Sequence, residues 1–213
     1  DVKLRFAVIP TCTNMFLFQP KRSAGSERNA LTIGMVGSVG TWYLLDYMLQ
    51  CAARIFATNA DARLLVVNKS DHALIWKKLA GLGIPDGRVE ITAANYSEVA
   101  KHIGQMDFGL FFIKPAFSKK ASAPTKLGEF LACGVPCLTN TGVGDMDAIL
   151  KSSRTGICLE EFSPEAYDTA YQQIMDLLQE EGLAKRCRQT AEQYFSLEQG
   201  IAEYQRIYQE LAS

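Results

Sequence analysis

FSKKASAPTKLGEFLACGVP, residues 117–136, decides the fold, because this stretch joins an apolar strand to an amphipathic helix. The run DFGLFFI at 107–113 is short and apolar and is stopped by Pro115, which is typical of a buried parallel strand. Pro124 suits the first helical position, because an N–H at that position would have no acceptor within the helix. The pattern therefore predicts a strand, a polar turn and a helix that runs to Gly134.

The start of this helix is the first candidate binding site. Free N–H groups and the helix dipole attract phosphate or carboxylate there, and Lys126 adds a positive charge within one turn. Ser122 or Ala123 would cap the helix. The apolar residues should face the sheet and leave Lys126 and Glu129 on a more exposed side. Two interpretations of the pair stay open: an ordinary surface ion pair, or an anion-binding lysine beside a carboxylate that accepts hydrogen bonds from vicinal hydroxyls.

Composition favours one globular α/β domain. The chain has 213 residues, 48% of them hydrophobic, and a formal net charge of -1, so it can bury a full core. This charge argues against a nucleic-acid partner, which usually requires clustered lysine and arginine. We find no apolar run that could span a bilayer and expect no signal peptide. A cytoplasmic location is therefore expected.

Metal ligands are sparse in the sequence. The six cysteines include no C-x-x-C pair, and the chain has two histidines, so reduced buried thiols are expected rather than a zinc site. Asp145 and Asp147 look like a paired-carboxylate or metal site, but two acids in the first turn of a helix are more often caps and dipole partners. We expect no metal and no cofactor.

Strands alternate with helices along most of the chain. Further strands are predicted at 31–36, 63–68, 89–92, 135–140 and 156–159, with helices from about residue 43, at 73–82 and around 149–150. This alternation predicts an α/β fold with a Rossmann-like parallel sheet, right-handed crossovers and helices on both faces. Amphipathic helices at 163–178, 182–195 and 197–211 would form a C-terminal helical segment.

The loops after the strands should share one rim of the sheet, because ligands bind beyond the carboxyl ends of parallel strands. This rule brings together residues 37–40, 92–96 and 114–122. The glycines of Gly37-Ser38-Val39-Gly40 either serve plain turn geometry or let backbone N–H groups approach a phosphate. In the second loop, Asn95 or Ser97 should cap the next helix, with an acid in its first turn.

These motifs resemble those of a known family. SAPTKLGEFLACGVP at 122–136 is similar to the donor-site signature of retaining GT-B glycosyltransferases of the family-4-like group, and GSVGTWY at 37–43 resembles their glycine loop. Residues 8–20 resemble the segment that leaves the first domain of such enzymes, and residues 195–208 their C-terminal crossover helix. The resemblance implies the C-terminal half of a GT-B fold.

The resemblance also implies a site for a nucleotide-diphosphate sugar, with no metal. Glu129 would hold the ribose, the Thr125-Lys126 turn would face the diphosphate, and Tyr96 would stack on the nucleobase. No catalytic residue is assigned. The implied donor-binding residues are Gly37, Ser38, Gly40, Asn95, Tyr96, Lys114, Ser122, Thr125, Lys126 and Glu129.

Two positions depart from the family pattern. Ala121 stands where many members have a second glutamate that contacts the donor sugar. After the glycine loop, many members have an arginine and a lysine that clamp the diphosphate, whereas this chain has Trp42 and Tyr43. Lys126 would therefore have to neutralise more of the negative charge of the diphosphate, together with Lys114 or Lys119.

The implied organisation is an interdomain linker at 1–20, a nucleotide-sugar-binding domain at 21–195 and a crossover helix at 196–213. The acceptor-binding half would be missing, so the fragment should bind donor and turn over poorly. The full enzyme would act in bacterial glycan or polysaccharide synthesis, transferring a sugar to a saccharide or lipid-linked saccharide, with peripheral association at the cytoplasmic membrane face.

Two other functions stay open. A nucleotide-sugar 2-epimerase shares the two-domain architecture. A non-enzymatic α/β regulatory or interaction domain, such as a receiver, should offer an acidic cluster at the end of the first strand, where residues 35–38 read MVGS.

Overall fold

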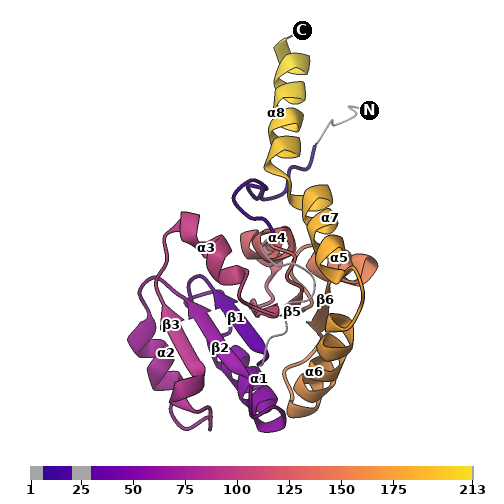
Figure 1. Cartoon of the computed structure of the whole chain (residues 1–213). Coiled ribbons are helices and arrows are strands. Elements are labelled where there is room, and N and C mark those ends of the chain that lie inside the picture. Colours follow the sequence, from indigo (N-terminus) through magenta and orange to yellow (C-terminus); the bar gives the residue numbers. More distant parts are fainter. Residues whose placement is uncertain (1–6, 21–29, 213) are drawn as a thin grey trace.

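A parallel six-stranded sheet forms the centre of the computed structural model, which describes residues 7–20 and 30–212 (Figure 1). The predicted polar link at 21–29 lies outside the described residues. The strands are β1 Thr32–Val36, β2 Arg63–Val67, β3 Val89–Thr92, β4 Phe108–Leu110, β5 Cys137–Asn140 and β6 Gly156–Leu159. Their order is β3-β2-β1-β4-β5-β6, with all neighbours parallel. The predicted Rossmann-like sheet is confirmed.

Helices cover both faces of the sheet. They are α1 Leu45–Thr58, α2 His72–Leu79, α3 Tyr96–Ile103, α4 Thr125–Ala132, α5 Met146–Ser153, α6 Pro164–Leu178, α7 Leu183–Phe195 and α8 Leu197–Ala212. The chain moves outward through β1, β2 and β3 and then returns to β4 on the other side of β1. Because crossovers are right-handed, this reversal puts α1 and α2 on one face and α3, α4 and α5 on the other. α6 packs on α1, and α7 packs on α4 and α5 (Figure 1).

α4 packs closely on β4 because the strand has a glycine beneath the helix. Leu127, Phe130 and Leu131 are fully buried, as their helical spacing predicts. The Phe130 ring lies over Gly109, where an added Cβ would be 2.7 Å from its ring carbons. It also stacks on Phe111, with ring centroids 6.2 Å apart. This contact fixes the depth at which α4 lies on the sheet.

Three element boundaries differ from the predicted ones. The predicted strand at 107–113 ends at Leu110, and Ile113 instead forms an antiparallel bridge with Tyr43. That bridge also delays α1, which starts at Leu45 rather than at residue 43. Pro124 is the residue before α4 rather than its first residue, since its extended backbone leads into Thr125.

The N-terminal segment passes over α4 and is held between α4 and the junction of α7 and α8. The Thr13 N–H donates to Phe195 O at 2.6 Å, and the Leu197 N–H donates to Thr13 O at 3.1 Å. Arg188 donates to the carbonyls of Phe18 and Met15 at 2.6 and 3.2 Å. This segment is therefore part of the folded domain.

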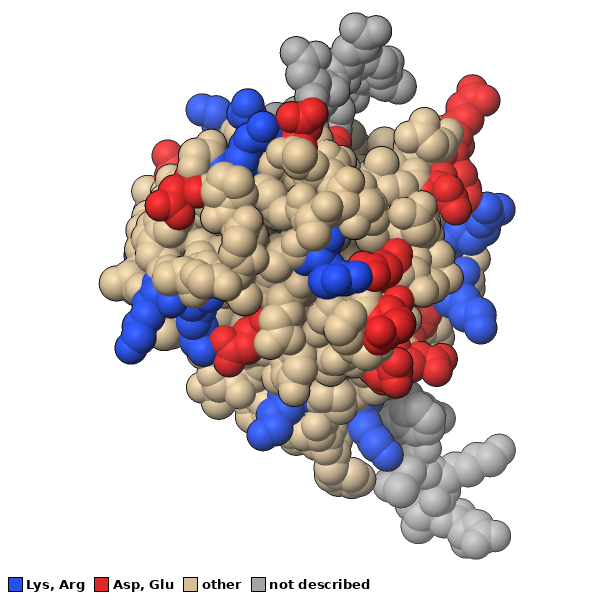
Figure 2. Space-filling model, turned by 90° about the horizontal axis from the view of Figure 1, so that it is seen from below, with Lys and Arg blue, Asp and Glu red and all other residues tan. Residues whose placement is uncertain are grey.

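α8 projects from the body (Figure 1). Its exposed large apolar side chains are Ile201, Tyr204, Tyr208 and Leu211. On the opposite side of the molecule, lysine and arginine alternate with acidic residues (Figure 2), in keeping with the near-zero net charge. Among the helices of the described ranges, none is long and apolar enough to cross a bilayer.

Gly109→Ala should lower the free energy of unfolding by about 1–3 kcal/mol, because the new methyl group overpacks the contact with Phe130. Gly87→Ala is the matched control, since a Cβ there meets nothing within 4 Å, and should change stability by less than about 0.5 kcal/mol. Urea denaturation of both variants measures the difference. Equal stabilities would contradict the proposed packing.

Candidate functional site

The candidate site lies beyond the carboxyl ends of β1 and β4, where the strand order reverses. Doubly wound sheets open a crevice at this point because the flanking helices lie on opposite faces. The loops after the two strands are tied together by hydrogen bonds. The Leu44 N–H donates to Phe112 O at 3.0 Å, and the Lys114 N–H donates to Trp42 O at 2.8 Å. The loops after β1 and β4, two of the three that were predicted to share the rim, are therefore hydrogen-bonded to each other at this switch point.

The turn after β1 offers backbone donors. Gly37 has φ +96°, which favours glycine, and Thr41 has φ +44°, an uncommon conformation for a β-branched residue. The N–H groups of residues 38–41 have no acceptor within the part of the chain that the structure describes. Unpaired N–H groups on one turn form a cradle for an anion.

Lys126 reaches this turn from the first turn of α4. Its Nζ lies 3.2 Å from where a Cβ on Gly37 would be, so a side chain at position 37 would press on the ammonium group. The Nζ also lies 3.5 Å from the centroid of the Tyr43 ring and 5.8 Å from that of Phe111. Only 7% of the residue is exposed. The lysine is thus enclosed between the glycine turn and two aromatic rings.

Burial changes the acid–base behaviour of Lys126. Desolvation disfavours the ammonium form and lowers the pKa of Lys126 from its usual value near 10.5 to about 7, although the nearby Glu129 carboxylate opposes this shift. The side chain therefore exists in both protonation states near neutral pH. An anion bound at the turn would favour the ammonium form, so binding would draw in a proton.

Glu129 lies one turn further along α4 and is 8% exposed. Burial raises its pKa, and the Lys126 ammonium partly offsets that rise. The prediction that both residues lie on an exposed side is wrong, because Tyr43, the N-terminal segment and α7 pack around this short helix. They do not form an ion pair with each other within 4.0 Å. An ordinary surface ion pair is therefore excluded.

The loop after β3 borders the same site. Asn95 is the N-cap of α3, and Glu98 in the first turn accepts a hydrogen bond from the Asn95 N–H at 2.9 Å, as predicted. Tyr96 follows with 55% of its surface exposed, and its ring meets Phe18 edge-on at 5.5 Å. Burial, and then the Glu129 carboxylate, raise the pKa of Tyr96 above its usual value.

Three predicted residues contribute less directly. Ser122 lies beside Gly144, where an added Cβ would come within 1.9 Å of the Ser122 carbonyl oxygen. It lines a separate groove of about 400 Å³ with Pro10 of the N-terminal segment. Lys114 meets the turn only through its backbone N–H, and its side chain is exposed. Thr125 is the exposed first residue of α4.

Asn68 is a contributor that the sequence reasoning missed. Its Nδ2 donates to Gly37 O at 3.0 Å and to Asp71 Oδ2 at 3.2 Å, and its Oδ1 accepts from the Ser70 N–H at 3.0 Å. The residue is buried and lines a small pocket with Gly37 and Ser38. It therefore fixes the carbonyl side of the glycine turn. A polar residue directly after the apolar β2 was the signal available in the sequence.

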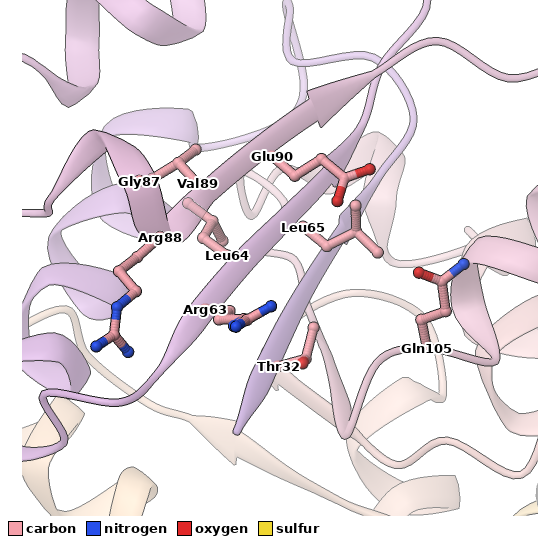
Figure 3. A pocket seen from close by; sticks show the side chains of 9 residues that line it. All are labelled: Thr32, Arg63, Leu64, Leu65, Gly87, Arg88, Val89, Glu90 and Gln105. Carbon is pink, nitrogen blue, oxygen red and sulfur yellow. The ribbon is translucent and has the colours of Figure 1, made fainter. Parts of the chain in front are cut away.

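A hollow of about 360 Å³ occurs at the other edge of the sheet (Figure 3). It is lined by the first residues of three strands, which are Thr32, Arg63 and Val89. This amino-terminal edge is remote from the glycine turn, and its lining carries both Arg63 and Glu90. Within 7–20 and 30–212, no group of three or more His, Cys, Asp and Glu could hold a metal ion.

Replacing Lys126 with Met tests the buried lysine. A lysine with a folded pKa near 7 and an unfolded pKa near 10.5 makes the unfolded state bind more protons above pH 7, so the free energy of unfolding rises with pH. From pH 7 to 8.5 this contribution rises by roughly 1.5 kcal/mol. Urea denaturation at each pH should show that the free energy of unfolding of the wild type, minus that of Lys126→Met, increases by roughly that amount.

Loss of the ammonium in the variant also raises the pKa of Glu129 further, which removes stability from the variant as the pH rises through that pKa. Both effects increase the difference in the same direction. Lys120→Met, at an exposed lysine of the preceding loop, is the control and should show a constant difference. A constant difference for Lys126→Met would contradict the burial argument.

Several solved structures share the fold. A glycosyltransferase from Rickettsia africae superposes with a TM-score of 0.76 at 17% identity, over 97% of this chain and 57% of that chain. An Anabaena protein solved with UDP and glucose gives 0.67 at 14% identity, over 97% and 56%. The C-terminal domain of a glycosyl transferase group 1 family protein from Francisella tularensis gives 0.64 at 14% identity, over 87% and 99%.

Sequence comparison reaches beyond the fold. The chain is 29% identical over 163 residues to N-acetyl-alpha-D-glucosaminyl L-malate synthase of Bacillus anthracis. This alignment covers 76% of this chain and 40% of the relative. This chain therefore spans about two fifths of the length of that relative and just over half of the length of the Rickettsia chain. Residues 30–178 match the family described as Glycosyl transferases group 1. Since this match covers well over half of its residues, the chain belongs to the glycosyl transferase group 1 family and has the Rossmann-like fold of GT-B enzymes.

Proposed function

We propose that this chain is the donor-binding domain of a retaining glycosyltransferase and that it binds a nucleotide-diphosphate sugar at the glycine turn. The observation that carries the proposal is the position of Lys126, whose buried Nζ lies against Gly37 beside unpaired backbone N–H groups. The family match favours sugar transfer over epimerisation or a receiver-like role. The Anabaena structure, which contains UDP, supports a nucleoside diphosphate as the ligand.

The diphosphate would lie between the turn of residues 37–41 and the start of α4. Backbone N–H groups would donate to its oxygens, and the helix dipole would favour its charge. Lys126 would be protonated in the complex because the anion restores the stability of the ammonium form. As the bond to the sugar breaks, charge increases on the departing diphosphate, and this fixed set of donors stabilises it. The proposal assigns this work to the protein rather than to a metal.

The nucleoside would extend from the diphosphate toward α3. Glu129 would accept hydrogen bonds from the ribose hydroxyls, the use of a carboxylate that dinucleotide-binding folds also make. Its burial limits competition from water, so these hydrogen bonds would be well formed. Tyr96, exposed at the start of α3, would offer its ring to the base. Asn95 would act through the helix cap that positions Tyr96.

The acceptor substrate would be bound by the whole protein and not by this domain alone. We propose an acceptor hydroxyl on a saccharide or lipid-linked saccharide, bound by regions that the longer relatives have beyond the length matched here. Peripheral association with a membrane would accompany a lipid-linked acceptor. Ser122, beside the groove that also contains Pro10, would face that side rather than the diphosphate.

Gly37→Ala should weaken the binding of nucleoside diphosphate roughly tenfold, because the new Cβ displaces Lys126 and charged hydrogen bonds are lost. Gly81→Ala is the matched control, since Gly81 has φ +86° but nothing within 4 Å of its Cβ position. Both variants should lose about 1 kcal/mol of stability to backbone strain. Calorimetric titration with UDP, GDP and ADP measures binding.

Only Gly37→Ala should reduce affinity. If all three diphosphates fail to bind the wild-type chain at millimolar concentration, the proposed function is wrong. If both glycine variants bind as the wild type does, the diphosphate does not lie at this turn.

A further inference from the structure

Two consecutive aromatic residues at the end of the glycine turn each lie beneath a lysine ammonium. The Nζ of Lys126 lies 3.5 Å from the centroid of the Tyr43 ring, and the Nζ of Lys119 lies 4.2 Å from the Trp42 ring. Lys119 comes from the segment between β4 and α4, and Lys126 comes from the first turn of α4. The turn with unpaired N–H groups is therefore flanked by one buried cation and one partly exposed cation.

We propose that Lys119, held on the Trp42 ring, is the second cation of the diphosphate site. This inference rests on the proposed function and adds a binding residue and the residue that positions it. From the sequence, Lys114 and Lys119 were equal candidates for this role. The structure favours Lys119, which is half-buried on Trp42. The Lys114 side chain is exposed and has no ring or ion-pair contact with the residues that the structure describes.

Both members of the Lys119–Trp42 pair have anchored backbones. The Trp42 N–H donates to Gly40 O at 2.6 Å, and Trp42 O accepts from the Lys114 N–H at 2.8 Å. Lys119 ends the 3-10 helix Phe117–Lys119, and its carbonyl accepts from the Ser122 and Gly144 N–H groups at 3.2 and 2.9 Å. The backbone is therefore fixed on both sides of the contact between the Lys119 ammonium and the Trp42 ring, which reduces the ordering cost of binding.

The local charge supports an anionic ligand. From residue 108 to residue 128 the chain has four lysines and no Asp or Glu. Lys119 has no carboxylate within 4.0 Å in the described ranges, whereas Arg54, Arg186 and Arg206 each form ion pairs. The simpler interpretation is a lysine stem packed on an exposed indole. That interpretation assigns the ammonium no effect on phosphate binding, and this difference can be measured.

The pair has a specific consequence for ligand choice. Lys126 would meet the phosphate nearest Gly37, while Lys119 would meet the phosphate nearer Trp42. A monophosphate can engage one of these cations, and a diphosphate can engage both. Lys119 should therefore contribute mainly to the preference for nucleoside diphosphate over monophosphate. Trp42 contributes through the position of Lys119, so it is a positioning residue.

Calorimetric titration of the full chain with the pairs UDP and UMP, GDP and GMP, and ADP and AMP tests this inference. Lys119→Met and Trp42→Leu should each reduce the ratio of diphosphate to monophosphate affinity about fivefold. Lys119→Arg should keep the ratio, because a guanidinium also stacks on indole and binds phosphate. Lys120→Met is the charge-matched control and should also keep it, since the Lys120 Nζ is 5.9 Å from the exposed Phe117 ring.

The double variant Lys119→Met with Trp42→Leu should lose no more than either single variant, because both changes remove one unit. The inference is overturned if Lys119→Met keeps the wild-type ratio, or if Lys120→Met reduces it equally. Thermal melting of each variant shows whether the fold is retained. Failure of every nucleotide to bind the wild-type chain would reject the proposed function and the inference together. Tight diphosphate binding that Lys119→Met leaves unchanged would reject the inference alone.

Discussion

The enclosure of the Lys126 ammonium between the glycine turn and the Tyr43 ring is the constraint on which the site depends. Taking an ammonium group out of water is unfavourable unless other groups replace the lost solvation. Here the nearby partners are the Tyr43 ring and the Glu129 carboxylate, and the pKa of Lys126 falls to about 7. An anion bound at the turn would therefore stabilise the ammonium form of Lys126.

The surrounding fold maintains this arrangement. Gly109 lets Phe130 lie close to β4, which sets the depth of α4 and therefore the position of Lys126. Asn68 holds the Gly37 carbonyl from the neighbouring strand. The reversal of strand order between β1 and β4 brings the two loops together at one edge. Each element has a local structural role, and together they produce one pre-organised cationic turn.

Much of the fold could be predicted from the sequence, because the hydrophobic periodicity and the glycine and proline turn signals indicate the same elements along the chain. The strands at 89–92 and 156–159 match β3 and β6, since both have clear turn signals on either side. The helix start near Pro124 was predicted to within one residue. The strand at 107–113 was predicted too long, because its last residues bond to the turn after β1, a tertiary contact that periodicity does not contain.

The sequence predicted that Lys126 lies near the glycine turn, but it did not predict how deeply Lys126 and Glu129 are buried. The lysine and glutamate of α4 were identified from their spacing, yet their burial depends on the Tyr43 ring and on the N-terminal segment, which come from distant parts of the sequence. Asn68 escaped attention because its role is a side-chain bond to another loop. Such contacts depend on the packed structure, so spacing along the chain gives little indication of them.

A crystal structure of the chain with a bound nucleoside diphosphate tests the account most directly. We expect phosphate oxygens within hydrogen-bond distance of Lys126 Nζ and of the N–H groups of residues 38–41, with the ribose hydroxyls on Glu129. A diphosphate bound in the groove beside Gly144, or in the hollow at the starts of β1, β2 and β3, would contradict the account.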